Sequence, residues 1–369
     1  MSLSIQIGMV TSVIGLIVIN IANNRNNEEK DIIVDALNTI GIVINALLVV
    51  VLIISSKFLG TNFGFHSTAP FFLLGLFLII TTPLTIRNAL LQARHDFTGL
   101  SISTALSSGF KIIGAVALIL LSFGASGAIG GLVLAQSIAY LYVLQKTKAH
   151  TPFRKKLFDL EHFYDKQNRK LIFKEVKYGG LVFAAMFSTL FLYTTDILFV
   201  KHYFNPAEAG LYGGVSAVAR IIFFVTSSIA GVLIATITTK TTHSEGRRIL
   251  TKGFLLLLAV NLPCYLIFTF APNLVIRILM GVRFMGYAHF LAPIALAVIL
   301  ASFVNLFFNY FLAKRTYFAA IIAIPSILLT GLMIYLHHAT ITSVINAYIL
   351  GGLITLLALL ILFVREGKK

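Results

Sequence analysis

Long apolar runs, each separated from the next by a short polar break, recur along the whole chain. A helix needs about 20 apolar residues to cross a bilayer, at about 1.5 Å per residue. Eleven runs reach this length, near residues 3–22, 33–56, 70–90, 100–122, 126–145, 178–201, 207–238, 253–271, 285–312, 317–336 and 340–364. The pattern predicts an all-α fold, a polytopic membrane protein with about 11 transmembrane helices.

The break between the sixth and seventh runs carries a complete helix-start signal. It reads KHYFNPAEAGLY, in which Asn205 suits the N-cap, Pro206 the first helical position and Glu208 the third. We therefore expect the runs on either side to form a helical hairpin whose arms both cross the bilayer.

Each arm of this hairpin contains one charged residue, Asp196 in the first and Arg220 in the second. Measured from the break, Asp196 lies about 12 Å deep and Arg220 about 22 Å deep. Helical side chains lean toward their own N-terminus, so these two lean toward each other in antiparallel arms. Charges at such depth are functional candidates. A direct pair, a water-bridged pair and a purely structural role in orienting two helices all fit.

Composition supports the membrane assignment and excludes several classes of protein. Hydrophobic residues make up 58% of the 369 residues and charged residues 11%, which is more apolar than a soluble domain. The single cysteine, Cys264, excludes a disulfide framework and a zinc cluster. The sequence has no metalloprotease, nucleophile-elbow or phosphate-loop motif, and its external loops are too short for a catalytic domain. We expect neither an enzyme nor a metal site.

The net charge of +16 is spread over several short loops, a distribution typical of membrane proteins rather than of nucleic-acid binding. When alternate loops are assigned to alternate sides, one side holds most of the Lys and Arg residues. The other side holds only Lys57, Lys201, Arg277 and Arg283. The positive-inside rule makes the basic side cytoplasmic, with the C-terminus on it. The odd number of spans places residue 1 outside, so a first helix is expected to be missing.

The longest cytoplasmic segment divides the chain into an N-terminal helical part of about five spans, residues 1–145, and a C-terminal part of six, residues 178–369. The segment itself, residues 146–177, mixes aromatic and basic residues at roughly helical spacing. This composition suits an interfacial helix on anionic lipid headgroups, or a linker with a solvated charged face.

Three segments of the chain resemble the polysaccharide (O-antigen, Wzx-like) flippases of the multidrug/oligosaccharidyl-lipid/polysaccharide exporter superfamily. The segment TDILFVKHYFNPAEAGLYGGVSAVARI, residues 195–221, is similar to the junction of the seventh and eighth helices in that family. Residues 87–120 are similar to its fifth helix and the preceding loop, although Ala93 stands where Gly is common. Residues 23–30, NNRNNEEK, are similar to the polar loop after its second helix.

This resemblance implies two pseudo-symmetric six-helix lobes around a central cavity, with the first lobe here lacking its first helix. It also implies a membrane flippase that translocates a lipid-diphosphate-linked oligosaccharide by alternating access. The substrate is anionic, so mid-span cations are the candidate cavity ligands: Lys111 and Arg220. Asn305 and Asn309 share one helix face and could bind sugar hydroxyls, although hydrogen bonding between helices is the default role of such side chains.

Asp196 is the candidate for coupling to H⁺ or Na⁺, and we expect no other cofactor. We expect a monomer in the cell (cytoplasmic) membrane. Three other functions compete with this one, of which the glycan polymerase or ligase is excluded by the short external loops. A drug or cation exporter of the same superfamily predicts an acidic cavity. A glycan polymerase or ligase predicts a large external loop with catalytic Arg or His. A truncated, transport-dead paralogue would act only as a scaffold.

Overall fold

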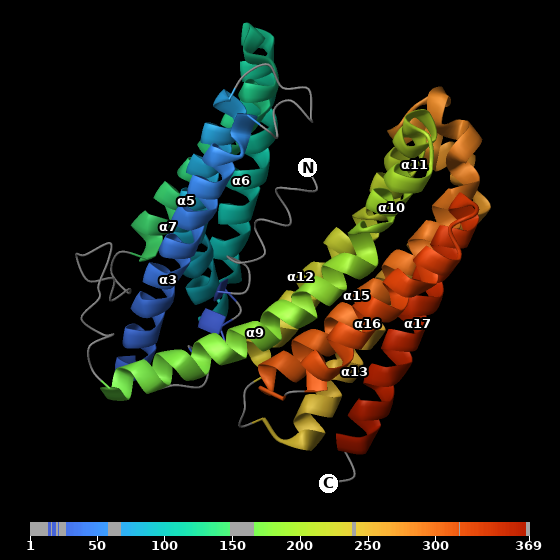
Figure 1. Ribbon diagram of the computed structural model, residues 1–369. Helices are drawn as coiled ribbons and strands as arrows, with labels where there is room; N and C mark the ends of the chain where they lie inside the picture. Colours follow the sequence, from blue (N-terminus) through green and yellow to red (C-terminus); the bar gives the residue numbers. More distant parts are fainter. Residues whose placement is uncertain are drawn as a thin grey trace. The chain divides into compact units, whose positions relative to one another are not determined.

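The computed structural model describes most of the chain: residues 14–15, 17–19, 21, 27–57, 68–147, 166–237, 241–316 and 318–366. The fold divides into two compact units, residues 1–179 and residues 180–369. Ordered segments within the described residues are helices, so the all-α fold class is confirmed (Figure 1). Most of the predicted first span, near 3–22, and most of the predicted linker, residues 148–165, lie outside the described residues, although residues 14–15, 17–19 and 21 of that span are helical.

Four long helices of the first unit lie within the described residues and pack side by side. They are α3 (Asn27–Ile54), α5 (Ala69–Ala93), α6 (Phe97–Leu118) and α7 (Gly124–Thr147), with the π-helical turn η1 (Ile119–Phe123) between α6 and α7. In this unit α5 packs on α3 and α7, and α7 packs most extensively on α6. Helix α9 (Lys166–Thr194) begins within the first unit and ends within the second.

Polar side chains join α5 to its neighbours inside the first unit. Asn45 of α3 is fully buried and donates from Nδ2 to the Leu78 carbonyl at 3.1 Å and to the Thr82 hydroxyl of α5. Near the other end of α5, Arg87 donates to the Thr147 hydroxyl of α7 at 2.5 Å. A buried polar group in lipid must find its partner within the protein. These bonds therefore fix the order of the helices.

The contact between α6 and α7 depends on glycine. A Cβ built on Gly131 of α7 would lie 2.7 Å from the Ala115 Cα of α6, closer than real side chains approach. The two backbones touch at this point, as small residues allow in membrane helices. At its other end, α6 begins at Asp96, whose carboxylate accepts from the Gly99 N–H at 2.9 Å and pairs with Lys146 of α7 at 3.0 Å. The hydrogen bond from Gly99 has the larger effect and the one from Lys146 the smaller, and both lower the pKa of Asp96, so the carboxylate stays ionised.

The second unit contains the remaining helices. They are the end of α9, α10 (Asp196–Tyr203), α11 (Pro206–Ala219), α12 (Ile221–Thr236), α13 (His243–Phe270), α14 (Pro272–Leu279), the 3₁₀ segment η2 (Val282–Phe290), α15 (Leu291–Ala313), α16 (Phe318–Leu336) and α17 (Ile341–Glu366). Helix α15 is the most buried of these and contacts α11, α12, α13 and α17. It forms the core of this unit.

Within the described residues, nine helices are long and apolar enough to cross a membrane, and α16 contributes a shorter apolar segment, Ile321–Leu336. The protein is therefore a multi-pass membrane protein. The predicted helix start at Asn205 is confirmed: its side chain accepts from the Glu208 N–H at 2.9 Å, and Pro206 is the first helical residue.

Several boundaries differ from the prediction, and α9 starts at Lys166, within the predicted linker, rather than near residue 178. Helix α13 starts at His243 rather than near residue 253, because Thr242 and Glu245 form a reciprocal capping box that extends it. The predicted loop after the eighth run contains the short helix α14 and the segment η2, joined through Gly281, whose φ of 88° suits glycine.

The hairpin arms each contain a break at a charged residue. Helix α9 ends at Thr194 and α10 starts at Asp196, while α11 ends at Ala219 and α12 starts at Ile221. Arg220 stands in the second break. The breaks therefore lie at the two residues that the sequence singles out.

We predict that Gly131→Ala destabilises the first unit by about 1–3 kcal/mol, because the added methyl group meets the α6 backbone. The matched control is Gly109→Ala in α6, where nothing lies within 4 Å of the added Cβ. There the change should be neutral or stabilising by up to about 1 kcal/mol, since Ala favours a helix over Gly. Thermal denaturation in detergent measures both. Equal melting temperatures would contradict the close packing.

Candidate functional site

Asp196 is the centre of a buried polar cluster in the second unit. It is the first residue of α10 and only 6% exposed. Its Oδ2 accepts hydrogen bonds from the Tyr212 hydroxyl at 2.8 Å and from the Ser216 hydroxyl at 2.9 Å. Its Oδ1 forms an ion pair with Nη2 of Arg220. The direct pair that the sequence left open is present.

Helix geometry explains why these partners meet one carboxylate. Tyr212, Ser216 and Arg220 are spaced four residues apart, so they lie on one face of the second arm. Asp196 stands in the first arm of the same hairpin, opposite that face. Two of these partners, Tyr212 and Ser216, were not among the residues that sequence reasoning selected. Their spacing from Arg220 is a signal that could have found them.

Arg220 also binds the backbone of the first arm. Its Nη2 donates to the Thr194 carbonyl at 3.2 Å, at the end of α9, so one nitrogen holds both the carboxylate and the helix break. The guanidinium carries five N–H donors. Its Nε is buried without a hydrogen-bond partner among the described residues. Arg220 therefore keeps donor capacity beyond the pair.

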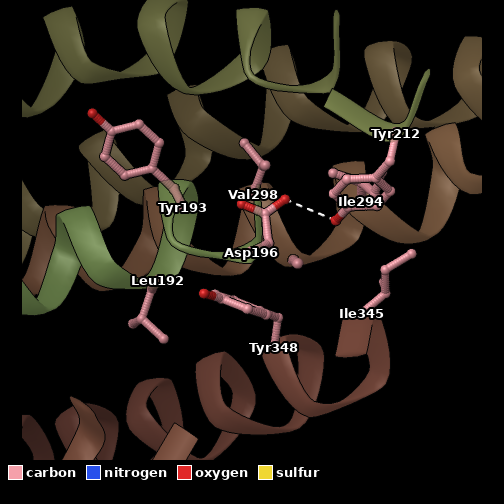
Figure 2. Close-up of a pocket in the computed structure, with 9 residues that line it drawn as sticks. Leu192, Tyr193, Asp196, Tyr212, Ile294, Val298, Ile345 and Tyr348 are labelled. Carbon is pink, nitrogen blue, oxygen red and sulfur yellow. Dashed lines mark hydrogen bonds between the residues drawn. The ribbon is translucent and has the colours of Figure 1, made fainter. Parts of the chain in front are cut away.

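A small pocket adjoins the carboxylate, as Figure 2 shows. Tyr348 of α17 lies beside Asp196, whereas the ring of Tyr193 of α9 points away from the carboxylate. The side chains of Ile294, Val298 and Ile345 complete an apolar wall. The pocket has room for about one water molecule. It is too small for an oligosaccharide, so its occupant would be water or a small ion.

The electrostatics of the cluster follow from its burial. Taking two charges out of water is costly, and the pair is stable only if the remaining hydrogen-bonding groups are also satisfied. Here three side chains donate to one carboxylate, which meets that condition for Asp196. Removing one partner would leave the other charge buried without compensation.

The two candidate asparagines lie together on α15, as their spacing predicts. Both are half-buried, and Asn309 donates from Nδ2 to the Asn305 carbonyl at 2.8 Å and to its side-chain oxygen at 3.0 Å. Among the described residues, the Asn305 amide group and the Asn309 side-chain oxygen form no further hydrogen bond. The pair is thus partly satisfied within its own helix.

Lys111 lies in the first unit, in the middle of α6, with its side chain exposed. Among the described residues it has neither an ion pair nor a hydrogen bond. No carboxylate in the described part of its unit neutralises it, in contrast to Arg220. Within the same described part of the chain, no group of three or more His, Cys, Asp or Glu side chains is arranged to hold a metal ion.

The sequence matches the model of a family described as "Polysaccharide biosynthesis protein" over residues 2–289. No curated protein gives a significant match to the chain.

The fold is similar to those of several transporters. One is a multidrug resistance MATE family transporter of the MOP superfamily in its outward-facing conformation, with a TM-score of 0.75, 14% identity, and coverage of 99% of this chain and 84% of that one. A MOP superfamily transporter from Pyrococcus furiosus has a TM-score of 0.74 and 14% identity, with 100% and 86% coverage. The eukaryotic MATE transporter AtDTX14 has a TM-score of 0.74 and 11% identity, with 98% and 84% coverage.

We predict strong coupling between Asp196 and Arg220. Asp196→Ala and Arg220→Ala should each destabilise the protein by about 3–5 kcal/mol, because each leaves an uncompensated buried charge. The double variant should lose much less than the sum of the single losses. Denaturation in detergent of the four proteins completes the cycle. Additive losses would show that the two side chains do not interact.

Proposed function

We propose that this chain, which belongs to the polysaccharide biosynthesis protein family, translocates a lipid-diphosphate-linked oligosaccharide across the cell membrane by alternating access. The family match carries this proposal, because it covers most of the chain and concerns polysaccharide synthesis. The resemblance to polysaccharide flippases is confirmed by this family and by the fold of MOP superfamily transporters. Family and fold indicate a transporter.

The sign of the mid-span charges supports an anionic substrate. Lys111 is a cation without an acidic partner among the described residues, and Arg220 keeps a buried Nε without an acceptor. A cation at mid-depth is costly unless it has a partner, and a diphosphate group would supply one. We assign Lys111 a point-charge contact to phosphate and Arg220 a forked contact.

The remaining groups have distinct roles in this proposal. Asn305 and Asn309 would bind sugar hydroxyls through the amide atoms that their mutual bond leaves over. Asp196 is the carboxylate for coupling to H⁺ or Na⁺, since it adjoins a pocket that accommodates a water-sized species. A diphosphate that draws Arg220 away would free the Asp196 carboxylate for such a cation.

The orientation follows from charge. Most Lys and Arg residues flank one set of helix ends, so we place that side and the C-terminus in the cytoplasm. The protein would then be a multi-pass monomer of the cytoplasmic membrane, with anionic headgroups against residues 146–177.

A drug exporter is the second candidate, because similar folds include multidrug transporters. The fold alone favours neither function, and the archaeal relative is described as having a reversed polarity of its binding pocket that suggests a different function. By the same criterion, the basic character of Lys111 and Arg220 favours an anionic substrate here. A cationic drug would be repelled by Lys111.

We predict that Lys111→Ala sharply reduces flipping while expression and melting temperature stay near wild type, because its exposed side chain has no partner in the described residues. The assay reconstitutes the protein in vesicles and measures how much lipid-diphosphate oligosaccharide an outside-added glycosidase can reach. The control is Lys252→Ala, which removes an exposed cation near the start of α13. Wild-type flipping by Lys111→Ala would contradict the phosphate contact.

For Arg220, the informative change is Arg220→Lys, because it keeps the charge that Asp196 needs and removes the fork. We expect a folded protein whose flipping is reduced about tenfold or more, since an ammonium cannot form two parallel bonds to phosphate. The same vesicle assay measures the rate of flipping by this variant and by the wild type. Unchanged flipping would leave Arg220 a structural role only.

A further inference from the structure

We propose that one exposed face of α6, formed by Ser101, Thr104, Ser108 and Lys111, lines the substrate path of the first unit and leads the diphosphate from the cytoplasmic end of that helix to its middle. The inference rests on the proposed function. It adds three hydroxyl residues to the candidate site and assigns a direction to the path.

The four side chains lie on one face of the helix. Their spacings are three, four and three residues, which is the repeat of a single helical face. All four are exposed in the structure. Phe97, which is half-buried, and Ala115 fall in the same sector, and the exposed Ile112 borders it. Between Ser101 and Lys111 the face itself is therefore exposed and polar.

A different face of α6 is exposed and apolar. Ile102, Ile113 and Leu120 are 42%, 63% and 78% exposed. They recur at the helical repeat and lie about 100° or more around the helix axis from the polar face. A surface of large aliphatic side chains is suited to lipid. Helix α6 therefore has one exposed face that lipid would cover and another that lipid would not stabilise.

The packing of α6 leaves this polar face free. The contact side of the helix carries Ser103, only 1% exposed, and Gly114, which lies against Gly131 of α7. The helix is thus held by α7 on a side about 100–120° around the axis from the centre of the polar face. The polar face can meet water or substrate without any change in that contact.

Hydrogen bonding distinguishes the polar face from an ordinary lipid-facing one. A hydroxyl in lipid normally donates to its own helix, and Thr104 does so, to the Leu100 carbonyl at 2.9 Å. Ser101 and Ser108 form no hydrogen bond within the described residues. Unsatisfied hydroxyls and an unpaired ammonium are each costly in hydrocarbon and inexpensive in water. Their joint presence on one face indicates a water-filled path.

The polar groups of the face follow one another along the α6 axis, with the hydroxyls nearer the start of the helix and the lysine nearer its middle. Ser101 lies one turn from the start of α6, and Lys111 lies ten residues further, about 15 Å along the helix axis. Under the proposed orientation the start of α6 is cytoplasmic. Hydroxyls, which can bind sugar or water, come first, and the single positive charge that attracts the diphosphate comes last. The charge thus draws the headgroup inward past the hydroxyls.

Cysteine accessibility tests the face directly. The background is Cys264→Ala, which removes the only cysteine of the chain. Single variants Ser101→Cys, Thr104→Cys and Ser108→Cys are compared with Ser103→Cys on the packed side and Ile113→Cys on the lipid side. The probe is a membrane-impermeant methanethiosulfonate reagent on protein in vesicles. We expect the first three to react about tenfold faster or more than either control, because a thiolate forms only in water.

Inorganic pyrophosphate then tests the ligand class. It should slow modification of Ser108→Cys, which lies one turn from Lys111, and this protection should disappear when Lys111→Met is added. Equal reactivity of the polar-face variants and Ile113→Cys would overturn the inference, even if the protein flips lipid-linked oligosaccharide. Reactive variants without protection would overturn the anion path. Protection without flipping of the oligosaccharide would instead overturn the proposed function and leave the anion path standing.

Discussion

The ion pair between Asp196 and Arg220 is the interaction on which the second unit depends. A bilayer offers no water to either charge, so each must be neutralised within the protein. The structure meets this requirement with three side-chain donors around one carboxylate and with a bond from Arg220 to the Thr194 carbonyl. The same bonds join the two helix breaks of the hairpin. The kinks and the charges are therefore one structural feature.

The two units use different means to hold their helices. In the first, α6 and α7 approach until their backbones touch at Gly131, and Lys111 is left exposed on another face. In the second, α15 is buried almost throughout and the charge of Arg220 is compensated. One cation is thus built into a polar network, whereas the other is available in the described structure. Arg220 is paired and Lys111 is not within the described residues, and this difference separates the roles of the two cations.

Much of the helical fold and the Asp196–Arg220 pair could be predicted from the sequence, because both depend mainly on residues that are close together in the chain. Span length, the cap at Asn205 and the facing of Asp196 and Arg220 follow from helix geometry and from the cost of burying charge. The start of α13 at His243 does not follow from the apolar pattern, because a polar capping box extends this helix beyond its apolar run. The exposure of the α6 polar face could not be predicted, since it depends on which side of α6 packs on α7. Apolar length does not determine that side.

The spacing of the Asp196–Arg220 pair along the chain has a consequence for biogenesis. A charged residue at the centre of a helix costs the insertion machinery about 2.5–3.5 kcal/mol, so two such arms entering separately would bear that cost twice. Here both charges belong to one hairpin, with only the short turn around Asn205 between the arms. The arms can leave the ribosome in succession, neutralise each other and enter the lipid as a single unit. The bond that shapes the folded protein would thus also help to deliver it to the membrane.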